Sequence, residues 1–590
     1  MPLRASIQEV IEQDLDYGDG SDSLPYGFRY DHNGSIERMA AERPGGGHNW
    51  VSLCSPIEFL ATTEDADGKT PGLLVRVQND SGRWHKLAFP RAGLIGGDDL
   101  LRTLADHGLR FVPSGKDTTE LKHLLMSVVS DKRARCVPHV GWHENTFVLP
   151  DEIIGQSPDY EVVFQPRYVI DHHYKLAGTL DGWQKEVATR AVGNTRLTFS
   201  ISVSFAGPLL SLVGLDGGGF HWRGPSSSGK STALHVAGSV WGSGVQSWRT
   251  TDNALEGLAL AHNDAFLPLD EIAEIESRAA FNSAYMLANG QGKSRSNKTG
   301  EVRQKHKWRV IFLSTGEKSL ASKIAENGHK STAGQEVRVV DVPADAGAGM
   351  GLFESLHGFG QPSHFAEALR DATQRHYGHA SRAFLTKLTT DTPGFSKEIR
   401  EALRITAEKI CPKDADGQVR RVANRFALAA CAGELAISFG IVPWEKKTAY
   451  DAAQRCFDDW LKARGGTGKK EESDALEAVL GFIMRYSSRF RKWDVPEATI
   501  IPDCAGFVRE TKEGRSFYIF REAFQNQICN KNGVDYEHAA DMLAARGYME
   551  RGKDGKRTKS VRIPVHGQQR LYVVTLPMGE EEGEGEGEGE

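Results

Sequence analysis

The sequence lacks the features of membrane-spanning and disulfide-stabilised proteins. Its longest apolar stretch, near Phe205 to Leu215, is broken by Gly207, Pro208 and Gly214, and its first residues carry no apolar run typical of a signal peptide. Its seven cysteines form no CxxC pair and have no histidine at metal-ligand spacing, which argues against a zinc ribbon or a disulfide framework. We therefore expect a cytoplasmic protein with reduced thiols and no membrane segment.

An overall positive charge is also absent. The formal net charge is −6, but residues 580–590 contribute seven glutamates and no basic residue, so the rest of the chain carries −6 + 7 = +1. A surface for nucleic acid would therefore depend on local clusters of lysine and arginine, because overall charge supplies no attraction.

The length of 590 residues exceeds what one hydrophobic core can organise, so we expect several domains. Strand-like runs, helical periodicity and Gly-rich turns alternate along the chain, and a helix-like run at 539–548 before two strand-like runs is the order of a winged helix. We predict a flexible leader at 1–48, an α+β accessory domain at 49–175, an α/β core at 176–345, a helical domain at 346–470, a winged-helix-like domain at 471–578 and a disordered acidic tail at 579–590.

The strongest motif is Gly-Pro-Ser-Ser-Ser-Gly-Lys-Ser-Thr at 224–232. A P-loop needs glycines where backbone N–H groups turn onto phosphate, a lysine for the β- and γ-phosphate oxygens, and a hydroxyl for Mg²⁺. A strand-like run, 218–222, precedes the motif and a helix-like run, 232–240, follows it. The alternative is a chance match in a Ser/Gly loop. We predict an α/β P-loop NTPase core that binds ATP through Gly224, Pro225, Ser226, Ser227, Ser228, Gly229, Lys230, Ser231 and Thr232.

A second motif, Phe266-Leu-Pro-Leu-Asp-Glu271, is an apolar run that ends in two acids. In a P-loop ATPase the first acid orients Mg²⁺ and the second polarises the attacking water. By itself this pattern is an ordinary strand end, but it lies forty residues after Lys230. We predict that Ser231 and Asp270 hold Mg²⁺ and that Glu271 activates water.

A third apolar run, Trp308 to Thr315, ends in two hydroxyl residues. Related ATPases place a polar sensor here, between the two acids and the γ-phosphate. We predict Thr315 as this sensor, with Ser314 as the next choice. The alternative is that both hydroxyls cap a turn before Glu317.

Arg338, in the run Gly334-Gln-Glu-Val-Arg338, is a candidate arginine finger. An arginine that reaches the γ-phosphate of a neighbouring subunit accelerates hydrolysis by orders of magnitude. This role requires a homo-oligomeric ring, and we expect a hexamer. The alternative is an ordinary surface arginine.

Residues 292–307 contain six lysines and arginines against one glutamate, a local charge of +5. A basic, Gly-punctuated insertion between the acid run and the sensor run suits a β-hairpin in the pore of a ring. There Lys293, Arg295 and Lys298 would contact DNA phosphates. The alternative is a solvated hairpin without a ligand.

Several runs resemble the bacterial family called domain of unknown function 927. They include 224–232, 263–272 and 334–338, together with 141–143, 148–150, 421–427 and 432–436. The resemblance extends from about Trp50 to about Trp460, roughly 70% of the chain. It implies an AAA+/superfamily 3-like fold and helicase relatives on prophages and mobile elements.

The same resemblance implies that Arg421 or Arg425 is a second arginine that senses nucleotide, although a salt bridge on a helix surface is an equal alternative. The chain contains no primase metal cluster. A primase would therefore be a separate partner.

Three functions remain open. The first is an ATP-dependent DNA helicase or translocase that forms a ring and acts on single-stranded or forked DNA during replication of a phage or mobile element. The second is a DNA-binding initiator or regulator with an ATP-driven assembly switch, in which Lys553, Lys556, Arg557 and Lys559 of the predicted wing touch the DNA backbone. The third is a P-loop ATPase that acts on protein, for example in anti-phage defence.

Overall fold

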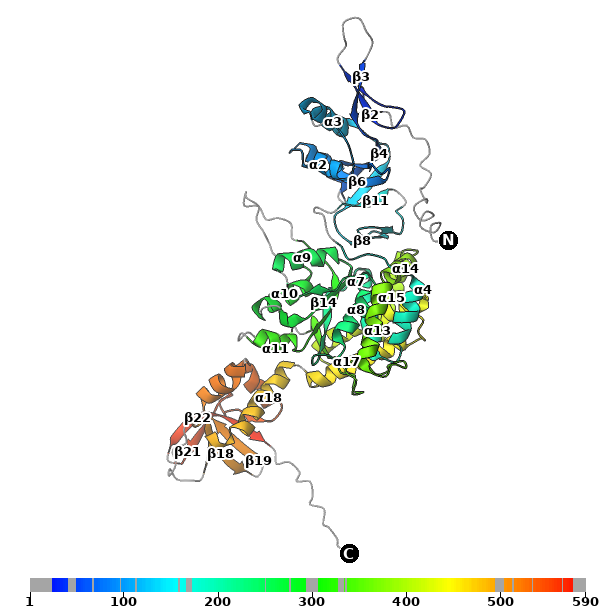
Figure 1. Ribbon diagram of the computed structural model, residues 1–590. Helices are drawn as coiled ribbons and strands as arrows, with labels where there is room; N and C mark the ends of the chain where they lie inside the picture. The colour runs from blue at the N-terminus through cyan, green and yellow to red at the C-terminus, as the bar shows by residue number, and fades with distance from the viewer. Residues whose placement is uncertain are drawn as a thin grey trace.

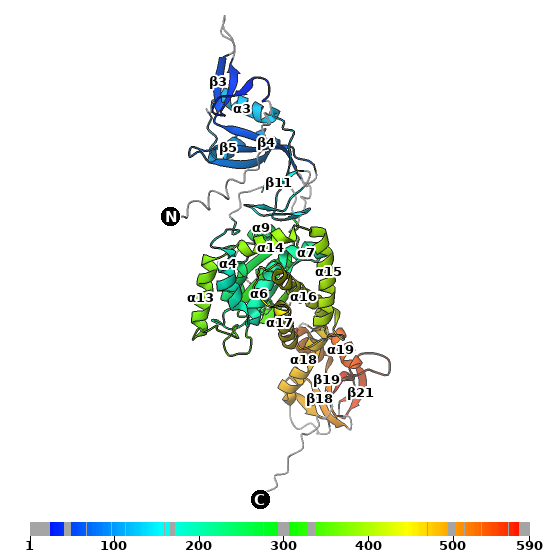
Figure 2. The same cartoon turned by 90° about the vertical axis from the view of Figure 1, so that its right-hand side faces the viewer.

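The described residues of the computed structural model form three parts that follow one another along the molecule (Figure 1, Figure 2). The N-terminal part lies at one end, the C-terminal part at the other, and the largest part between them. The structure describes residues 24–40, 49–65, 68–95, 97–111, 114–157, 160–165, 172–249, 251–274, 277–292, 306–326, 334, 337–468, 470–493, 503–511, 514–532, 534–564 and 566–576.

The N-terminal part is built mainly from β-strands. Its elements are β1 Phe28–Tyr30, β2 Ile36–Ala40, β3 Asn49–Cys54, β4 Ile57–Asp65, β5 Gly72–Gln78, β6 Trp84–Pro90, η1 Arg91–Leu94, α2 Asp99–Asp106, α3 Gly115–Ser127, β7 Arg133–Val137, β8 Gly141–His143, β9 Thr146–Val148, β10 Ile153–Ile154 and β11 Glu161–Phe164. Strands β1, β2 and β3 form one sheet, and a five-stranded sheet has the order β11-β7-β4-β5-β6.

The predicted flexible leader at 1–48 is wrong for its described part, residues 24–40. Strand β2 pairs with both β1 and β3, and Phe28 and Ile36 are buried. An ion pair between Arg38 and Asp117 of α3, 2.7 Å from Nη2 to Oδ1, joins this sheet to the helix. Phe28 and Ile36 share a hydrophobic core with Leu121 of α3, which is distant in sequence, so the local composition did not reveal these strands. The rest of the predicted leader, residues 1–23 and 41–48, lies outside the described residues.

The small sheet β8–β10 packs against the central part of the molecule. Val140 and Phe147 belong to the same hydrophobic core as the central sheet. Asn263 donates from Nδ2 to the Val140 carbonyl at 2.9 Å, and the Trp142 N–H donates to Asp264 Oδ2 at 3.2 Å. Packing therefore continues across the boundary that the sequence pattern placed at residue 175.

The central part carries the candidate site and begins with short helices. Its first elements are α4 Leu180–Trp183, η2 Gln184–Ala188, α5 Thr189–Ala191, α6 Thr195–Phe205, α7 Gly207–Val213, β12 Gly218–Arg223, α8 Lys230–Gly238, β13 Gln246–Ser247, α9 Asp252–Ala261, β14 Ala265–Asp270, η3 Ile272–Glu274, α10 Ser277–Asn289, β15 Val310–Gly316, α11 Leu320–Ala325 and β16 Val339–Pro343. The helices α13 Pro362–Arg375, α14 His379–Leu388, α15 Thr392–Ile410, α16 Gly417–Ser438 and α17 Thr448–Arg464 follow.

A parallel five-stranded sheet in the order β13-β14-β15-β12-β16 forms the centre of this part. Successive side chains of a strand point to opposite faces, so each buried strand contributes side chains to a hydrophobic core on either face of the sheet. Phe266 and Ile311 face α6, α8, α16 and α17, whereas Leu267 and Phe312 face α9, α10 and α11. The segment predicted as a helical domain, 346–470, thus shares a core with the sheet.

A membrane span is not evident among the described residues. No single helix in these ranges has the length and hydropathy to cross a bilayer, although the bent pair α6 and α7, at 55°, passes that test together.

The C-terminal part has a hydrophobic core of its own. Its elements are α18 Lys470–Arg485, η4 Ser487–Arg489, β17 Phe490–Lys492, β18 Gly506–Thr511, β19 Gly514–Ile519, η5 Ala523–Asn530, α19 Tyr536–Ala545, β20 Met549–Glu550, β21 Lys559–Ile563 and β22 Gly567–Leu576. The helix α19 is followed by the antiparallel pair β21–β22, in the helix-then-hairpin order of the sequence pattern.

The close approach of Gly218 to the partly buried Arg425 gives a test of the packing between the central sheet and α16. A Cβ at Gly218 would overlap the Arg425 guanidinium, which donates to the Gly217 carbonyl at 2.9 Å. We expect Gly218→Ala to lower the free energy of unfolding by about 1–3 kcal/mol, because the core cannot shift without losing that bond.

The control is Gly257→Ala in α9, where a Cβ would meet no atom within 4 Å. It should leave stability unchanged or raise it by up to about 1 kcal/mol. Urea unfolding of both variants measures the two free energies of unfolding. Equal values for Gly218→Ala and Gly257→Ala would contradict the prediction.

Candidate nucleotide-binding site

The loop 224–229 connects β12 to α8 at the carboxyl end of the sheet. Gly229 has a φ of +89°, and a Cβ there would come within 3.0 Å of the Phe353 ring. Ser227 also adopts a positive φ, of 59°. Left-handed residues in a turn that opens a helix direct backbone N–H groups toward one concave surface, which suits an anion.

The Lys230 side chain lies in the curve of this loop. Its Nζ donates to the carbonyls of Gly224 at 2.9 Å and Pro225 at 2.6 Å. Burial lowers the pKa of Lys230, and the carboxylates of Glu271, Glu317 and Asp270 oppose that shift. A largely buried ammonium at a helix N-terminus, with carboxylates nearby, fits the phosphates and the metal ion of a nucleotide.

The Asp270 carboxylate, at the end of β14, joins several elements of the site. Its Oδ1 accepts from the Ser231 hydroxyl at 3.3 Å, from the Glu271 N–H at 3.1 Å, and from the Thr315 hydroxyl. The Glu271 N–H also lies 3.2 Å from Thr315 Oγ1, and Glu271 has a φ of +52°. A non-glycine residue in this conformation costs free energy and persists only where its surroundings hold it. The structure therefore brings Ser231, Asp270, Glu271 and Thr315 together.

The order of the strands explains why Thr315 reaches Asp270. Strand β15 lies between β12 and β14, so its end lies between the phosphate loop and the acids. Thr315 is level with Trp222, the next-to-last residue of β12, and Ser314 is level with Leu269 of β14.

Ser314 points to the opposite face of β15 from Thr315. Its hydroxyl contacts His221 Nδ1 at 2.9 Å and accepts from Trp248 Nε1 at 2.9 Å. His221 Nε2 lies 3.0 Å from the Lys318 carbonyl, and burial lowers the pKa of His221 to about 4. Of the two hydroxyls considered from the sequence, Thr315 faces the site and Ser314 supports the strand beneath it.

Arg338 lies at the other end of the sheet from the phosphate loop. It directly precedes β16, whose Val339 is level with Gly219, whereas the loop follows Arg223. Five residues of strand separate the two ends, about 17 Å at 3.3 Å per residue. The structure therefore does not bring Arg338 to the phosphate loop of its own chain.

The two arginines considered as second sensors also lie away from the loop. Arg425 is partly buried and donates to the carbonyls of Gly217 and Arg338, at the amino end of the sheet. Arg421 is exposed and donates from Nε to the Gly417 carbonyl of its own helix at 3.3 Å. Through these contacts Arg425 joins the starts of β12 and β16, which is a structural role.

The predicted DNA-contacting residues Lys293, Arg295 and Lys298 lie outside the described residues. The described residues on either side of them run antiparallel. The Gly292 N–H donates to the His306 carbonyl at 2.9 Å, and the Trp308 N–H donates to the Gly290 carbonyl at 3.0 Å. The insertion thus leaves and re-enters the core at one place, directly before β15.

The basic residues of the predicted wing follow β20 and include the first residue of β21: Lys553, Lys556, Arg557 and Lys559. Arg557 donates to Asp541 of α19 at 2.9 Å, and Lys559 pairs with Glu550. Lys553 and Lys556 are exposed. Lys556 Nζ also lies 3.7 Å from Asp554 Oδ2, so three of the four cations are partly neutralised by acids of the same domain.

Two features of the site were not found from the sequence. Glu317 is a third carboxylate close enough to raise the pKa of Lys230. The segment 350–353 packs on the phosphate loop, where the Leu352 N–H donates to the Ser228 carbonyl at 2.9 Å and Phe353 covers Gly229. Glu317 could have been found from the sequence, because it lies two residues after Thr315 of the sensor strand. The contact of residues 350–353 with the loop could not, because it arises from tertiary packing and leaves no local sequence pattern.

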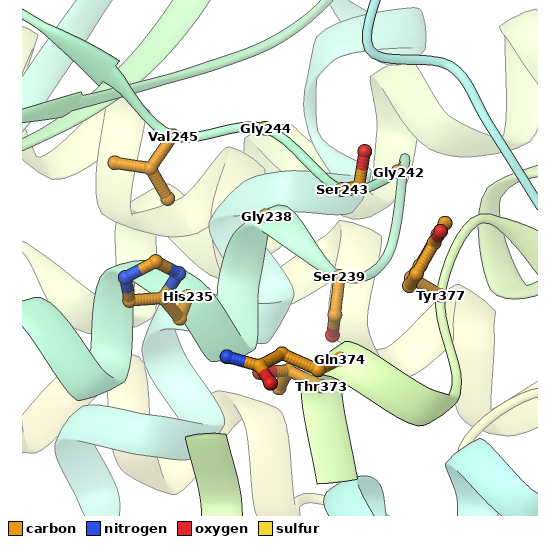
Figure 3. A pocket seen from close by; sticks show the side chains of 10 residues that line it. All are labelled: His235, Gly238, Ser239, Gly242, Ser243, Gly244, Val245, Thr373, Gln374 and Tyr377. Carbon is orange, nitrogen blue, oxygen red and sulfur yellow. The ribbon is translucent and has the colours of Figure 1, made fainter. Parts of the chain in front are cut away.

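A cavity of about 280 Å³ lies at the far end of α8 from the phosphate loop. Figure 3 shows the imidazole of His235 and the side chains of Thr373 and Gln374 around it. It contains none of the predicted site residues. Its lining consists of His235, Gly238, Ser239, Gly242, Ser243, Gly244, Val245, Thr373, Gln374 and Tyr377.

Two family models match the chain. Residues 28–307 match the domain of unknown function DUF927, and residues 471–580 match the Cch helix turn helix domain. The resemblance to domain of unknown function 927 is therefore confirmed. The matched range begins before Trp50 and ends at residue 307, short of Arg338 and of the runs at 421–436.

A solved structure described as "SCCmec type IV Cch - active helicase" has a similar fold. The TM-score is 0.70 at 17% sequence identity, and the match covers 94% of this chain and 98% of that chain. The chain thus shares a mixed α/β fold with that protein over nearly its whole length. No curated protein matches the sequence.

The buried His221 predicts a pH dependence of stability. Its pKa falls from an ordinary 6.5 to about 4, so the folded state takes up a proton less readily than the unfolded state. The stabilisation is complete above pH 6.5 and is lost as the pH falls from there through 4. Between pH 7.5 and pH 5 we expect His221 to account for about 2 kcal/mol of lost stability.

Urea unfolding of His221→Gln at the two pH values measures this contribution. The variant should lose less stability on acidification than the wild type does. His32→Gln, at an exposed position, serves as the matched control and should behave as the wild type. An unchanged pH dependence in His221→Gln would show that another group is responsible.

Proposed function

We propose that the protein is an ATP-driven DNA helicase or translocase that works as a homo-oligomeric ring, a hexamer, in the replication of a phage or mobile element. One observation carries the proposal: Ser231, Asp270, Glu271 and Thr315 converge beside the Lys230 loop at the carboxyl edge of a parallel sheet. The shared fold with a protein described as an active helicase supports the choice of reaction.

The residues present fit a nucleotide and a divalent cation. The loop 224–232 would hold the phosphates, with the Lys230 ammonium on the β- and γ-phosphate oxygens. Ser231 and Asp270 would hold Mg²⁺, an ion that keeps several waters and needs few protein ligands. Bound there, Mg²⁺ would neutralise negative charge on the phosphates.

Glu271 has the role of the base in this proposal. Its backbone N–H is held by Asp270 Oδ1 and Thr315 Oγ1, which fixes the residue at the end of β14. Its Oε1 also accepts from the Ala273 N–H at 3.1 Å, so the carboxylate is oriented by its own chain. A carboxylate held in this way can polarise a water molecule for attack on the γ-phosphate.

Arg338 would serve the site of an adjacent subunit. Its distance of about 17 Å from the loop of its own chain excludes a role in cis without a large rearrangement. A second copy that presents its β16 edge to the phosphate loop would supply the missing positive charge. This requirement for an adjacent copy is what supports the proposal of a ring.

DNA is the proposed track for the motor. The segment 292–307, with a charge of +5, begins and ends at one place beside β15, whose other end carries Thr315. Binding of phosphates by Lys293, Arg295 and Lys298 would therefore act on the strand that reaches Asp270. A primase, if one takes part, would be a separate chain.

The match of residues 471–580 to a helix turn helix domain favours a second candidate, a DNA-binding initiator that uses ATP as an assembly switch. The pairing of Arg557 with Asp541 counts against direct backbone contact by this part of the wing. Strand-displacement and footprinting assays separate the two candidates. Unwinding without a footprint favours the motor, and a footprint without unwinding favours the initiator.

Lys230→Ala and Glu271→Gln test the proposed chemistry. Lys230→Ala should lose ATP binding and hydrolysis together. Glu271→Gln should still bind ATP but hydrolyse it about 100-fold more slowly or worse, because a positioned base contributes 10²–10⁴-fold. The measurements are ATP binding and steady-state hydrolysis with single-stranded DNA present.

Lys318→Ala is the matched control for these variants, since Lys318 is exposed and pairs with Glu326 at 2.6 Å. It should keep wild-type hydrolysis. Full DNA-dependent hydrolysis by either Lys230→Ala or Glu271→Gln would refute the assignment. If the wild type hydrolyses ATP at the same rate with and without DNA, the proposal of a DNA motor is refuted.

A further inference from the structure

We infer that Tyr285 is a positioning residue that holds the Arg338 guanidinium at the surface for the site of a neighbouring subunit. The inference rests on the proposed role of Arg338 and adds a residue to it. Tyr285 belongs to no motif in the sequence and lies outside the site described above.

The contact between the two side chains is direct. The Arg338 Cζ lies 5.4 Å from the centroid of the Tyr285 ring, within the range of a cation–π interaction. The Arg338 Nη1 also donates to the Gly334 carbonyl at 2.9 Å. The guanidinium is thus held by a ring on one side and by a carbonyl of its own chain on the other.

The Tyr285 side chain does not lie in the hydrophobic core. Its neighbours Ala284 and Met286 in α10 are buried, whereas Tyr285 is 39% exposed. A large aromatic residue on the exposed side of a helix leaves apolar surface in water, which favours a contact or a partner there. Arg338, which is itself partly buried, is such a contact.

The backbone beneath Arg338 is fixed in place. Its carbonyl accepts from the Gly219 N–H at 3.0 Å and from the partly buried Arg425 guanidinium. Burial, and after it the charge of Arg338, lowers the pKa of Arg425 to about 10. With the backbone of Arg338 fixed in this way, the contact with the Tyr285 ring sets the direction of the Arg338 side chain.

Four variants test the inference: Tyr285→Ala, Tyr285→Phe, Arg338→Ala and the double variant Tyr285→Ala/Arg338→Ala. Loss of the ring should lower kcat for ATP hydrolysis about 2- to 30-fold, from the strength of a cation–π contact. The KM for ATP should change less than about 2-fold, because the phosphate loop of each chain is intact. Tyr285→Phe keeps the ring and should retain wild-type kcat. The double variant should be no slower than Arg338→Ala.

Trp84→Ala is the matched control, since Trp84 is also 39% exposed and lies beneath Arg76 at 4.9 Å in the N-terminal part. It should leave kcat unchanged. If Tyr285→Ala fails to fold, Tyr285→Leu keeps the apolar volume without the ring and should show the same loss of kcat.

The outcomes separate failure of this inference from failure of the proposed function. If Arg338→Ala is slow but Tyr285→Ala is not, or if Tyr285→Ala slows the Arg338→Ala enzyme further, Tyr285 does not act through Arg338. If Arg338→Ala itself keeps full kcat, the finger is wrong and the inference falls with it.

Discussion

The Asp270 carboxylate is the interaction on which the arrangement of the site depends. One oxygen accepts from the hydroxyl of Ser231 in the helix after the phosphate loop, from the hydroxyl of Thr315 in the central strand, and from the backbone of Glu271. Loss of any donor would uncouple one element from the other two. The strand order makes the junction possible, because β15 lies between the strand of the loop and the strand of the acids.

The length of the strands in this sheet keeps the phosphate loop and Arg338 apart. Its carboxyl edge carries the phosphate loop and the acids, and its amino edge carries Arg338, fixed from below by Arg425. A charge at the amino edge cannot assist a phosphate at the carboxyl edge of the same chain over about 17 Å. A neighbouring chain could join the two edges. The proposal of a ring therefore rests on the direction of the strands as much as on the presence of an arginine.

The sequence motifs near the phosphate loop could be found because their geometry is local. A strand, a loop at 224–229 and a helix are consecutive in the chain, and so are the strand and acids at 265–271. The choice between Thr315 and Ser314 was harder, because it depends on which face of β15 each residue occupies. The order of the segment 28–40 and the role of Arg425 could not be predicted, since the core that covers Phe28 and Ile36 and the carbonyl that Arg425 contacts come from segments distant in sequence. Tyr285 lacked any signal, because an aromatic residue at helical spacing usually indicates a core position.

The central claim, that each ATP site is completed by another chain, is tested most directly by mixing two inactive variants. Lys230→Ala subunits lack a working loop but carry Arg338, and Arg338→Ala subunits have an intact loop but no arginine to offer. In mixed oligomers of known composition, we predict that ATP hydrolysis in the presence of single-stranded DNA rises well above that of either variant alone. Activity that stays at the level of the separate variants, although mixed oligomers have formed, would contradict the account.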